Sequence, residues 1–503
     1  MNRRLLLIFV LLLALIPSLY LSYIHSVDSF LYTPLSNISE AYYTGRLGSV
    51  TTEQPVYVLL LYTISAICNI PPLQMAYMPI GALIFPLCIY ALSRKILESR
   101  TIPILLLLYF AFDYSLYTGH YSVLAYAWAH PLFFIFVLLY IMYSNSDRRN
   151  PSLIAFILLV FTCLVFLHPT YVFWAMSFAV ALNIIIAICK VTKVKSMKLI
   201  PTPYLTVCLF VMYFGFNQLF FGFYVHRVIL IEPEVISEQF FQMIQSFLGL
   251  GTGVTVPYQI SVGAPTSVIG YAAFARTSIL VSCILIGALS WVKKNYHVFA
   301  KKFDNMLTLM VALFIAGMMH TIGYALYGHI SMRFMILLFP IIAVLFLKKA
   351  GLKKVANVMV TLIVVLAVAQ TASFWSPGPQ FNNVDVESEP PSDWMISHTQ
   401  GQVVFLSDFL TSQMVKYYFS SVGRDVVQRF FTSNLFGDVV TGDKMITVAE
   451  FVVINKGMYS TGSVGWALYE PLGKYTAEIE DNVHLNQIYD DGREIVLRST
   501  YYN

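Results

Sequence analysis

Two aspartates stand at the ends of long apolar runs, where a chain of this kind leaves a membrane. Asp28 lies in HSVDSFLY after the first run, and Asp113 lies in YFAFDYSLYTGHY after the third. His25, His120 and several tyrosines flank them. A lone acid at such a place caps a helix or faces water. Two acids at matched depth on one side indicate a working site, because ionisable groups near a bilayer are costly and often catalytic.

Histidines also stand at the predicted outer ends of the apolar runs. With a carboxylate, two imidazoles can hold a metal ion, but no pair here has a ligand spacing such as HExxH. A histidine beside a helix-ending proline, as in VFLHPTYVF, is more often a hydrogen-bonded structural residue. His168 is kept as a residue that could line a substrate site, as is His25. The four histidines at outer ends are His120, His168, His320 and His329.

Composition indicates which elements position these residues. The chain has 503 residues, of which 58% are hydrophobic and 11% charged, and its mean hydropathy is +0.71. Soluble domains carry about 25% charged residues, so we expect an α-helical polytopic membrane protein. The net charge of +5 does not indicate nucleic-acid binding, because Lys and Arg form short clusters between apolar runs and no continuous basic face.

The apolar runs predict eleven membrane spans, since a helix needs about 20 apolar residues to cross roughly 30 Å of hydrocarbon. The run 333–347 is short for a span. The run 56–69 is too short to cross and is predicted to lie in the interface or dip into it. The predicted spans are 5–23, 72–93, 101–118, 122–143, 152–168, 171–189, 199–220, 274–292, 305–326, 333–347 and 355–374.

Basic residues predict the orientation, because Lys and Arg are enriched in cytoplasmic loops. Nineteen fall on the side of the amino terminus and four on the other side of the membrane part. We therefore expect a multi-pass protein of the cell (plasma) membrane with a cytoplasmic amino terminus and an extracytoplasmic carboxyl terminus. The four on the outer side are Arg46, Arg227, Arg276 and Arg333. The first run is predicted to be a retained anchor, because its apolar stretch exceeds the roughly 7–15 residues of a signal peptide.

Residues 1–374 form the predicted membrane domain, with external loops at 24–71 and 221–273, and residues 375–391 are predicted to be a linker. Residues 392–503 have mixed α/β signals. GQVVFLSDFLTSQMVKYYF predicts a strand and a helix capped near Ser407 or Asp408, EFVVINKG a buried strand, and NQIYDDGREIVLRS a hairpin. No catalytic motif stands out here, which favours a structural cap or a recognition module.

The order of these features resembles a known family. One span and an acid near its outer end come first. An amphipathic segment, TPLSNISEAYYTGRLG, a non-spanning apolar helix, PVYVLLLYTISAICNIPP, and a second acid in the next external loop follow. This layout resembles the C-type membrane glycosyltransferases (GT-C fold), which include protein O-mannosyltransferases, aminoarabinose transferases and oligosaccharyltransferase catalytic subunits. The resemblance covers most of residues 1–374, and 392–503 resembles the external domain of many members. Members often have paired acids in the first loop, where this chain has Asp28 alone.

The resemblance implies transfer of a sugar from a polyprenyl-phosphate-linked donor to a lipid, glycan or protein acceptor outside the membrane. Asp28 would deprotonate the acceptor hydroxyl or hold a divalent cation such as Mg²⁺ or Mn²⁺, and Asp113 would be the second ligand or would position the acceptor. Arg333, in YGHISMRFMILLFP, would bind the leaving phosphate or, alternatively, snorkel to lipid headgroups. Arg276 is the poorer candidate for the phosphate.

Two other classes remain open. A non-catalytic envelope or assembly protein would bind a partner through residues 392–503 and would not need Asp28 or Asp113. A transporter would need ionisable or helix-breaking positions near the bilayer midplane and two similar halves. The predicted spans are apolar at their centres, and the long loop in the second half has no counterpart in the first.

Overall fold

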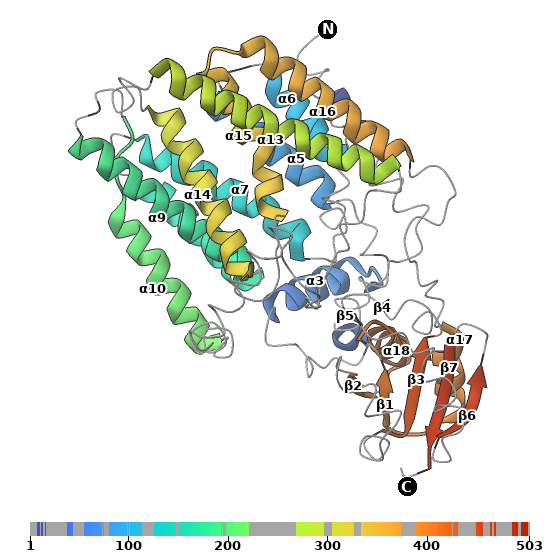
Figure 1. The fold of residues 1–503 in the computed structure, drawn as a ribbon. Helices are drawn as coiled ribbons and strands as arrows, with labels where there is room; N and C mark the ends of the chain where they lie inside the picture. Colours follow the sequence, from blue (N-terminus) through green and yellow to red (C-terminus); the bar gives the residue numbers. More distant parts are fainter. Residues whose placement is uncertain are drawn as a thin grey trace.

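The computed structural model is predominantly helical and has two parts, a helical bundle and a smaller α/β unit (Figure 1). The structure describes residues 8–10, 12, 13, 16, 38–43, 55–72, 74, 80–97, 99, 101–112, 125–146, 150–167, 169–192, 194, 198–220, 268–295, 304–325, 333–373, 389–407, 409–424, 426–430, 449–455, 463, 464, 467, 468, 485–490 and 494–500.

Every predicted apolar run from 72–93 onward contains a described helix. The run 56–69, predicted not to cross the membrane, contains α3 (Pro55–Cys68). The few described residues of the first run are helical as well. The remaining bundle helices are α5 (Ile80–Leu97), α6 (Ile102–Phe112), α7 (Ala125–Ser144), α8 (Pro151–Leu167), α9 (Pro169–Val191), α10 (Pro203–Phe220), α13 (Val268–Asn295), α14 (Asn305–Ala325), α15 (Arg333–Lys349) and α16 (Lys353–Ser373).

Two stretches of the described helices are long and apolar enough to cross a membrane. They are Tyr171–Val191, with a mean hydropathy of 2.3, and Ala275–Asn295, with a mean hydropathy of 1.7. Other apolar stretches of the described helices are shorter, at 10–17 residues, among them Pro151–Leu167 and Asn305–Met319.

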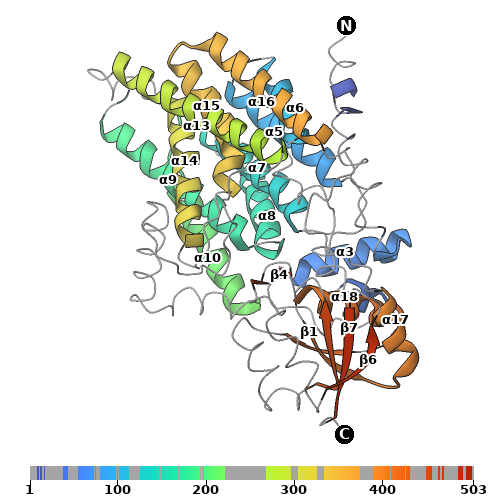
Figure 2. The same cartoon turned by 45° about the vertical axis from the view of Figure 1, so that its right-hand side comes forward.

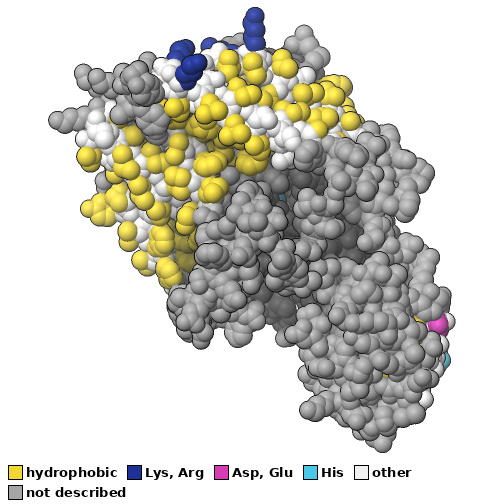
Figure 3. Space-filling view, in the orientation of Figure 1, with side chains coloured by type: hydrophobic (Ala, Val, Ile, Leu, Met, Phe, Trp, Pro, Cys, Tyr) yellow, Lys and Arg dark blue, Asp and Glu magenta, His cyan; other side chains and the backbone are white. Residues whose placement is uncertain are grey.

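Several basic helix ends meet at one end of the bundle, here called the lysine end. The ammonium group of Lys348 donates to the carbonyl of Leu97 at the end of α5, and Lys349 forms an ion pair with Asp304 just before α14. Both lysines lie in the last turn of α15, where a cation is favourable beside the helix carboxyl terminus. In Figure 3, Lys and Arg side chains gather along this end, above a face covered by hydrophobic side chains.

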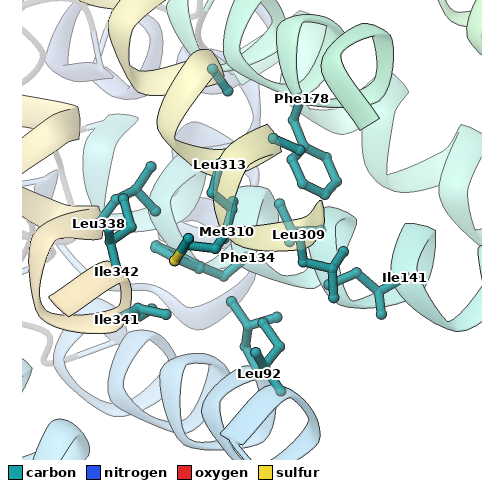
Figure 4. Packing of buried hydrophobic residues seen from close by; sticks show 14 of the residues in the cluster. Leu92, Phe134, Ile141, Phe178, Leu309, Met310, Leu313, Leu338, Ile341 and Ile342 are labelled. Atoms are coloured by element: carbon teal, nitrogen blue, oxygen red, sulfur yellow. The ribbon is translucent and has the colours of Figure 1, made fainter. Parts of the chain in front are cut away.

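The centre of the bundle is packed by apolar side chains from five helices. Leu92 of α5, Phe134 of α7, Phe178 of α9, Met310 of α14 and Ile342 of α15 are all 0% exposed and converge in Figure 4. In a bilayer, such close van der Waals packing holds helices together, because lipid tails are as apolar as the core.

A buried polar cluster joins α7, α9 and α10 toward the lysine end. The amide nitrogen of Asn183 donates to the Tyr140 hydroxyl and to Thr206 Oγ1, both at 2.9 Å. The Asn183 carbonyl oxygen accepts the backbone N–H of Thr202, which immediately precedes α10. Because these groups satisfy one another, the cluster fixes the start of α10 and leaves little capacity for a ligand.

The α/β unit contains a five-stranded sheet in the order β2-β1-β3-β7-β6. Strands β2, β1 and β3 are parallel, whereas β7 is antiparallel to both β3 and β6. The predicted strand and helix, buried strand and hairpin are all present. The bounds are α17 (Glu389–His398), β1 (Val403–Ser407), α18 (Phe409–Ser421), β2 (Val426–Phe430), β3 (Phe451–Asn455), β4 (Ser463–Val464), β5 (Ala467–Leu468), β6 (Leu485–Asp490) and β7 (Glu494–Ser499).

Two features of the α/β unit differ from the prediction. Strand β2 was not predicted, and α17 begins at Glu389, inside the predicted linker 375–391. Arg424 ties the end of α17 to the unit, because its guanidinium donates to the carbonyls of Ile396 and Gly401 at 2.7 and 3.0 Å and lies over the Phe419 ring. Figures 1 and 2 show the unit beyond α3, away from the lysine end of the bundle.

We predict that Gly287→Ala destabilises the bundle by about 1–3 kcal/mol, the usual cost of overpacking. A Cβ atom on Gly287 of α13 would lie 2.8 Å from Phe346 Cβ and 3.0 Å from the backbone nitrogen of Leu347 in α15. Gly215→Ala in α10 is the matched control, since nothing lies within 4 Å of the added atom. Thermal unfolding in detergent should show a clear loss for Gly287→Ala only. Equal stability of both variants would mean that α13 and α15 pack less closely than described.

Candidate functional site

Arg276 is buried deep in the half of the bundle opposite the lysine end. The span predicted at 274–292 placed it at the start of a helix, but α13 begins at Val268, so Arg276 lies eight residues inside. It is 2% exposed, and its guanidinium carbon lies 5.6 Å from the centroid of the Tyr109 ring in α6. An arginine remains charged in such a place, and the face of an aromatic ring offers it an electrostatic contact.

Aromatic rings continue from Tyr109 across three helices. The Tyr109 ring packs edge-on against Phe110 at 5.0 Å, and Phe110 packs against Phe85 of α5 at 5.6 Å. Phe85 lies 5.3 Å from the His130 ring of α7. The buried cation of α13 is therefore connected by ring contacts to a buried imidazole.

His130 forms the next link of this series. It is 7% exposed, and its ring meets Tyr171 of α9 edge-on at 5.1 Å. Tyr171 contacts Trp174 at 4.4 Å, and Phe133 of α7 packs against Trp174 at 5.7 Å. Residue 131 is a proline inside α7, which removes one backbone donor beside the imidazole.

These residues form one cluster, here called the aromatic cluster, which combines apolar rings with polar atoms. Guanidinium, imidazole, phenol and indole groups can all donate hydrogen bonds. In apolar surroundings such groups bind an anion more strongly than in water, and ring faces can stack on a sugar. The aromatic cluster consists of Phe85, Tyr109, Phe110, His130, Phe133, Tyr171, Trp174 and Arg276.

Most of the predicted site residues lie outside the described residues. This applies to Asp28, Asp113, His25 and His168. Arg333 is the first residue of α15, and only its backbone is described.

Two of these residues are close in sequence to the aromatic cluster. Asp113 directly follows Phe112, the last residue of α6, and is four positions after Tyr109. His168 stands between α8 and α9, three positions before Tyr171. Asp113 and His168 are therefore within four residues, along the sequence, of a member of the aromatic cluster.

The histidines predicted from the sequence stand at helix ends, so His130, inside a helix, was not predicted. The available signal was AWAHPLFF, an imidazole inside an apolar run that had to be either buried or functional. From the sequence, Arg276 at the predicted start of its span was the poorer candidate for the phosphate, whereas the structure places it inside α13.

A groove with a volume of about 550 Å³ lies between α9 and α10, outside the aromatic cluster. Asn183 and Thr206 line it, and both already belong to the buried polar cluster. Its remaining lining is apolar, so the residues that line this groove offer no group for acid–base chemistry. The apolar lining residues are Val180, Ile184, Pro203, Val207, Phe210, Val211 and Phe214.

Among the residues that the structure describes, no three His, Cys, Asp or Glu side chains come together as they do in a metal site. The two acids predicted to bind a cation are outside that part of the chain. The sequence matches no protein-family model, and none of the curated proteins compared with it is significantly similar. The candidate site is therefore argued from its geometry and from the chemistry of its residues.

Proposed function

We propose that the chain is a membrane glycosyltransferase of C-type (GT-C) fold, which transfers a sugar from a polyprenyl-phosphate-linked donor to an extracytoplasmic acceptor. The observation that carries this proposal is the buried Arg276 in the aromatic cluster. A charge within apolar helices is expensive, and such residues usually mark a substrate or ion pathway. A donor phosphate is the ligand that this charge fits best.

The proposal includes eleven spans, a cytoplasmic amino terminus and an extracytoplasmic α/β unit. It is supported by the helices found in the predicted ranges and by the lysines gathered at one end of the bundle. Under this topology the aromatic cluster lies in the outer half of the membrane. Arg276 then lies about 12 Å along the helix axis from the start of α13, at 1.5 Å per residue.

The donor would bind with its phosphate toward Arg276 and its isoprenoid chain among the bundle helices. The planar guanidinium can make two parallel hydrogen bonds to phosphate oxygens, a geometry that lysine does not offer. Tyr109, whose ring lies against Arg276, and His130, further along the aromatic cluster, supply further hydrogen-bonding groups. Arg333, at the start of α15, is the second cation of the proposed site.

Asp28 is the proposed base that removes the proton from the acceptor hydroxyl. The hydroxyl oxygen then forms a bond to the anomeric carbon of the sugar while the bond to the carrier phosphate breaks, and the arginine neutralises the negative charge left on the phosphate. Asp113 would position the acceptor. Carboxylates suit a hard cation such as Mg²⁺ or Mn²⁺, and one held by Asp28 and Asp113 would supply further charge neutralisation at the leaving group.

The topology predicts opposite accessibility for two exposed positions. Ser152→Cys, at the start of α8, should react with an impermeant thiol reagent only from the cytoplasmic side. Val422→Cys, after α18, should react only from outside, and Val422 is 54% exposed. Both variants require a background without the native cysteines. Labelling of both positions from the same side would contradict eleven spans.

Transfer should depend on Asp28 and Arg276 in different ways. Asp28→Asn keeps the shape and removes the base, so turnover should fall at least about 100-fold, within the usual range for general acid–base catalysis.

Arg276→Met keeps length and packing, so the protein should fold, because replacing a buried charge by an apolar side chain is often tolerated. Its transfer activity should be lost, and Arg276→Lys should restore only part of it.

The assay would use liposomes and a panel of lipid-linked sugars, with thermal unfolding measured for each variant. Arg498→Met is the control for arginine loss, since this side chain is 59% exposed and contacts Glu450 only at 3.8 Å. Wild-type transfer by a stably folded Arg276→Met would remove Arg276 from the site. Undiminished transfer by Asp28→Asn would leave that aspartate as a solvated end of the first span.

A further inference from the structure

Helix α18 is buried on the face that packs on the sheet, as an α/β fold requires. Val415 and Phe419 are 0% exposed and belong to a core with Phe405 and Val453. This apolar face explains how α18 covers the sheet. It does not explain the burial of its other side.

A second stripe of α18 is buried although it is mostly polar. Gln413, Lys416, Tyr417 and Ser420 are 6%, 7%, 7% and 3% exposed. Their i, i+3, i+4, i+7 spacing places them on one helix face, which turns away from Val415 and Phe419. On an isolated α/β unit such a face would be solvated. Another element of the chain therefore covers at least part of it.

Glu40 identifies that element. Its carboxylate lies 2.9 Å from the ammonium nitrogen of Lys416, with side-chain exposures of 14% and 9%. Glu40 belongs to the helical segment 38–43, whose Ile38, Ser39 and Ala41 are at most 2% exposed. A contact between two such distant parts of the sequence joins the first external segment to the terminal unit.

Glu40 is the charged residue of segment 38–43. Its sequence, ISEAYY, has no other acid or base apart from its two tyrosines. Partial burial and the neighbouring Tyr42 raise the pKa of Tyr43, so that Tyr43 stays neutral at physiological pH. Among the residues of this segment, Glu40 therefore supplies the negative charge that lies against Lys416.

We propose that segment 38–43 and the polar face of α18 form a docking interface fixed by the Glu40–Lys416 ion pair, and that Glu40 and Lys416 are positioning residues. The interface holds the terminal α/β unit against the external segment that begins after the first span. In the sequence, Asp28 lies between the first predicted span and this interface, so the interface would anchor the chain on the carboxyl-terminal side of the proposed base. This last consequence rests on the proposed function, whereas the interface itself does not.

The energetics favour a role in orientation. Removing one member of a buried ion pair leaves an uncompensated charge and is costly, whereas replacing both by apolar or neutral groups is often close to neutral. Lys416→Met and Glu40→Gln should each loosen the interface. The double variant Glu40→Gln/Lys416→Met should recover most of the loss. This recovery separates an ion pair from two independent packing contacts.

Cysteine reactivity in the full-length protein tests the interface directly. In a background without the six native cysteines, Ser420→Cys reports on the covered face, and Val422→Cys, a 54% exposed position, is the positive control. An impermeant maleimide should label Val422→Cys rapidly in every background. It should label Ser420→Cys slowly in the otherwise native chain and at least about tenfold faster with Glu40→Gln or Lys416→Met, since each 1.4 kcal/mol of lost docking corresponds to a factor of ten.

Glu450→Gln serves as the control for carboxylate loss, because its partner Arg498 is solvent-exposed; it should leave the labelling of Ser420→Cys unchanged. Thermal unfolding confirms that each variant is folded. The proposal is overturned if Ser420→Cys reacts as fast as Val422→Cys in the native background. It is also overturned if neither single variant changes its rate.

Transfer assays test the positioning role separately. Breaking the ion pair should lower turnover with little change in the apparent affinity for the donor, and the double variant should restore turnover. Faster labelling with unchanged turnover would keep the interface and reject the positioning role. Absence of transfer by the wild-type protein with every donor would reject the proposed function, while the labelling experiment would still decide the interface.

Discussion

The proposed site depends on one positive charge, Arg276, that is buried among apolar helices. A buried guanidinium is costly among apolar helices, so its surroundings must include groups of the protein or of a ligand that compensate its charge. The ring of Tyr109 supplies part of that compensation, and ring contacts from Phe110 to Trp174 continue the aromatic cluster from there. Such surroundings strengthen electrostatic interactions, so a phosphate that reached this place would be bound more tightly than at the membrane surface.

The two ends of the bundle differ in their chemistry. At the lysine end, cations follow helix carboxyl termini and pair with a carbonyl or with Asp304, which needs no ligand to explain it. In the opposite half, the buried Arg276 and His130 lie against aromatic rings of α5, α6 and α9. This asymmetry is why the second region is the better candidate for a functional site.

Much of the fold could be predicted because apolar runs and turn chemistry act locally. The ranges of the bundle helices, the apolar helix α3 and the hairpin of β6 and β7 all follow from hydropathy or residue pattern. The start of α13 was misplaced because its first residues, Val268 to Gly270, end the glycine-rich stretch that was assigned to the external loop 221–273. Helix α17 was missed because its prolines indicated a linker, yet proline is favoured in the first turn of a helix.

Tertiary features were harder to predict, since they depend on residues far apart in the sequence. The ring contact of Arg276 comes from α6, and the partner of Lys416 lies near the other end of the chain. A lysine in a helix of the pattern FLTSQMVKYYFSS is ordinarily solvated, so nothing local indicates its burial. His130 was not predicted because it is a single polar residue within a long apolar run, and such a run indicates only a buried helix.

Photo-cross-linking can show directly whether a polyprenyl phosphate binds beside Arg276. The probe is a short-chain polyprenyl phosphate with a photoreactive group beside the phosphate, added to the protein in lipid nanodiscs and mapped by mass spectrometry. If the donor phosphate binds at Arg276, we expect adducts within 102–112 and 268–280, the parts of α6 and α13 around Tyr109 and Arg276, and their loss when unlabelled polyprenyl phosphate competes. Adducts confined to the groove between α9 and α10, or adducts that no competitor removes, would contradict it.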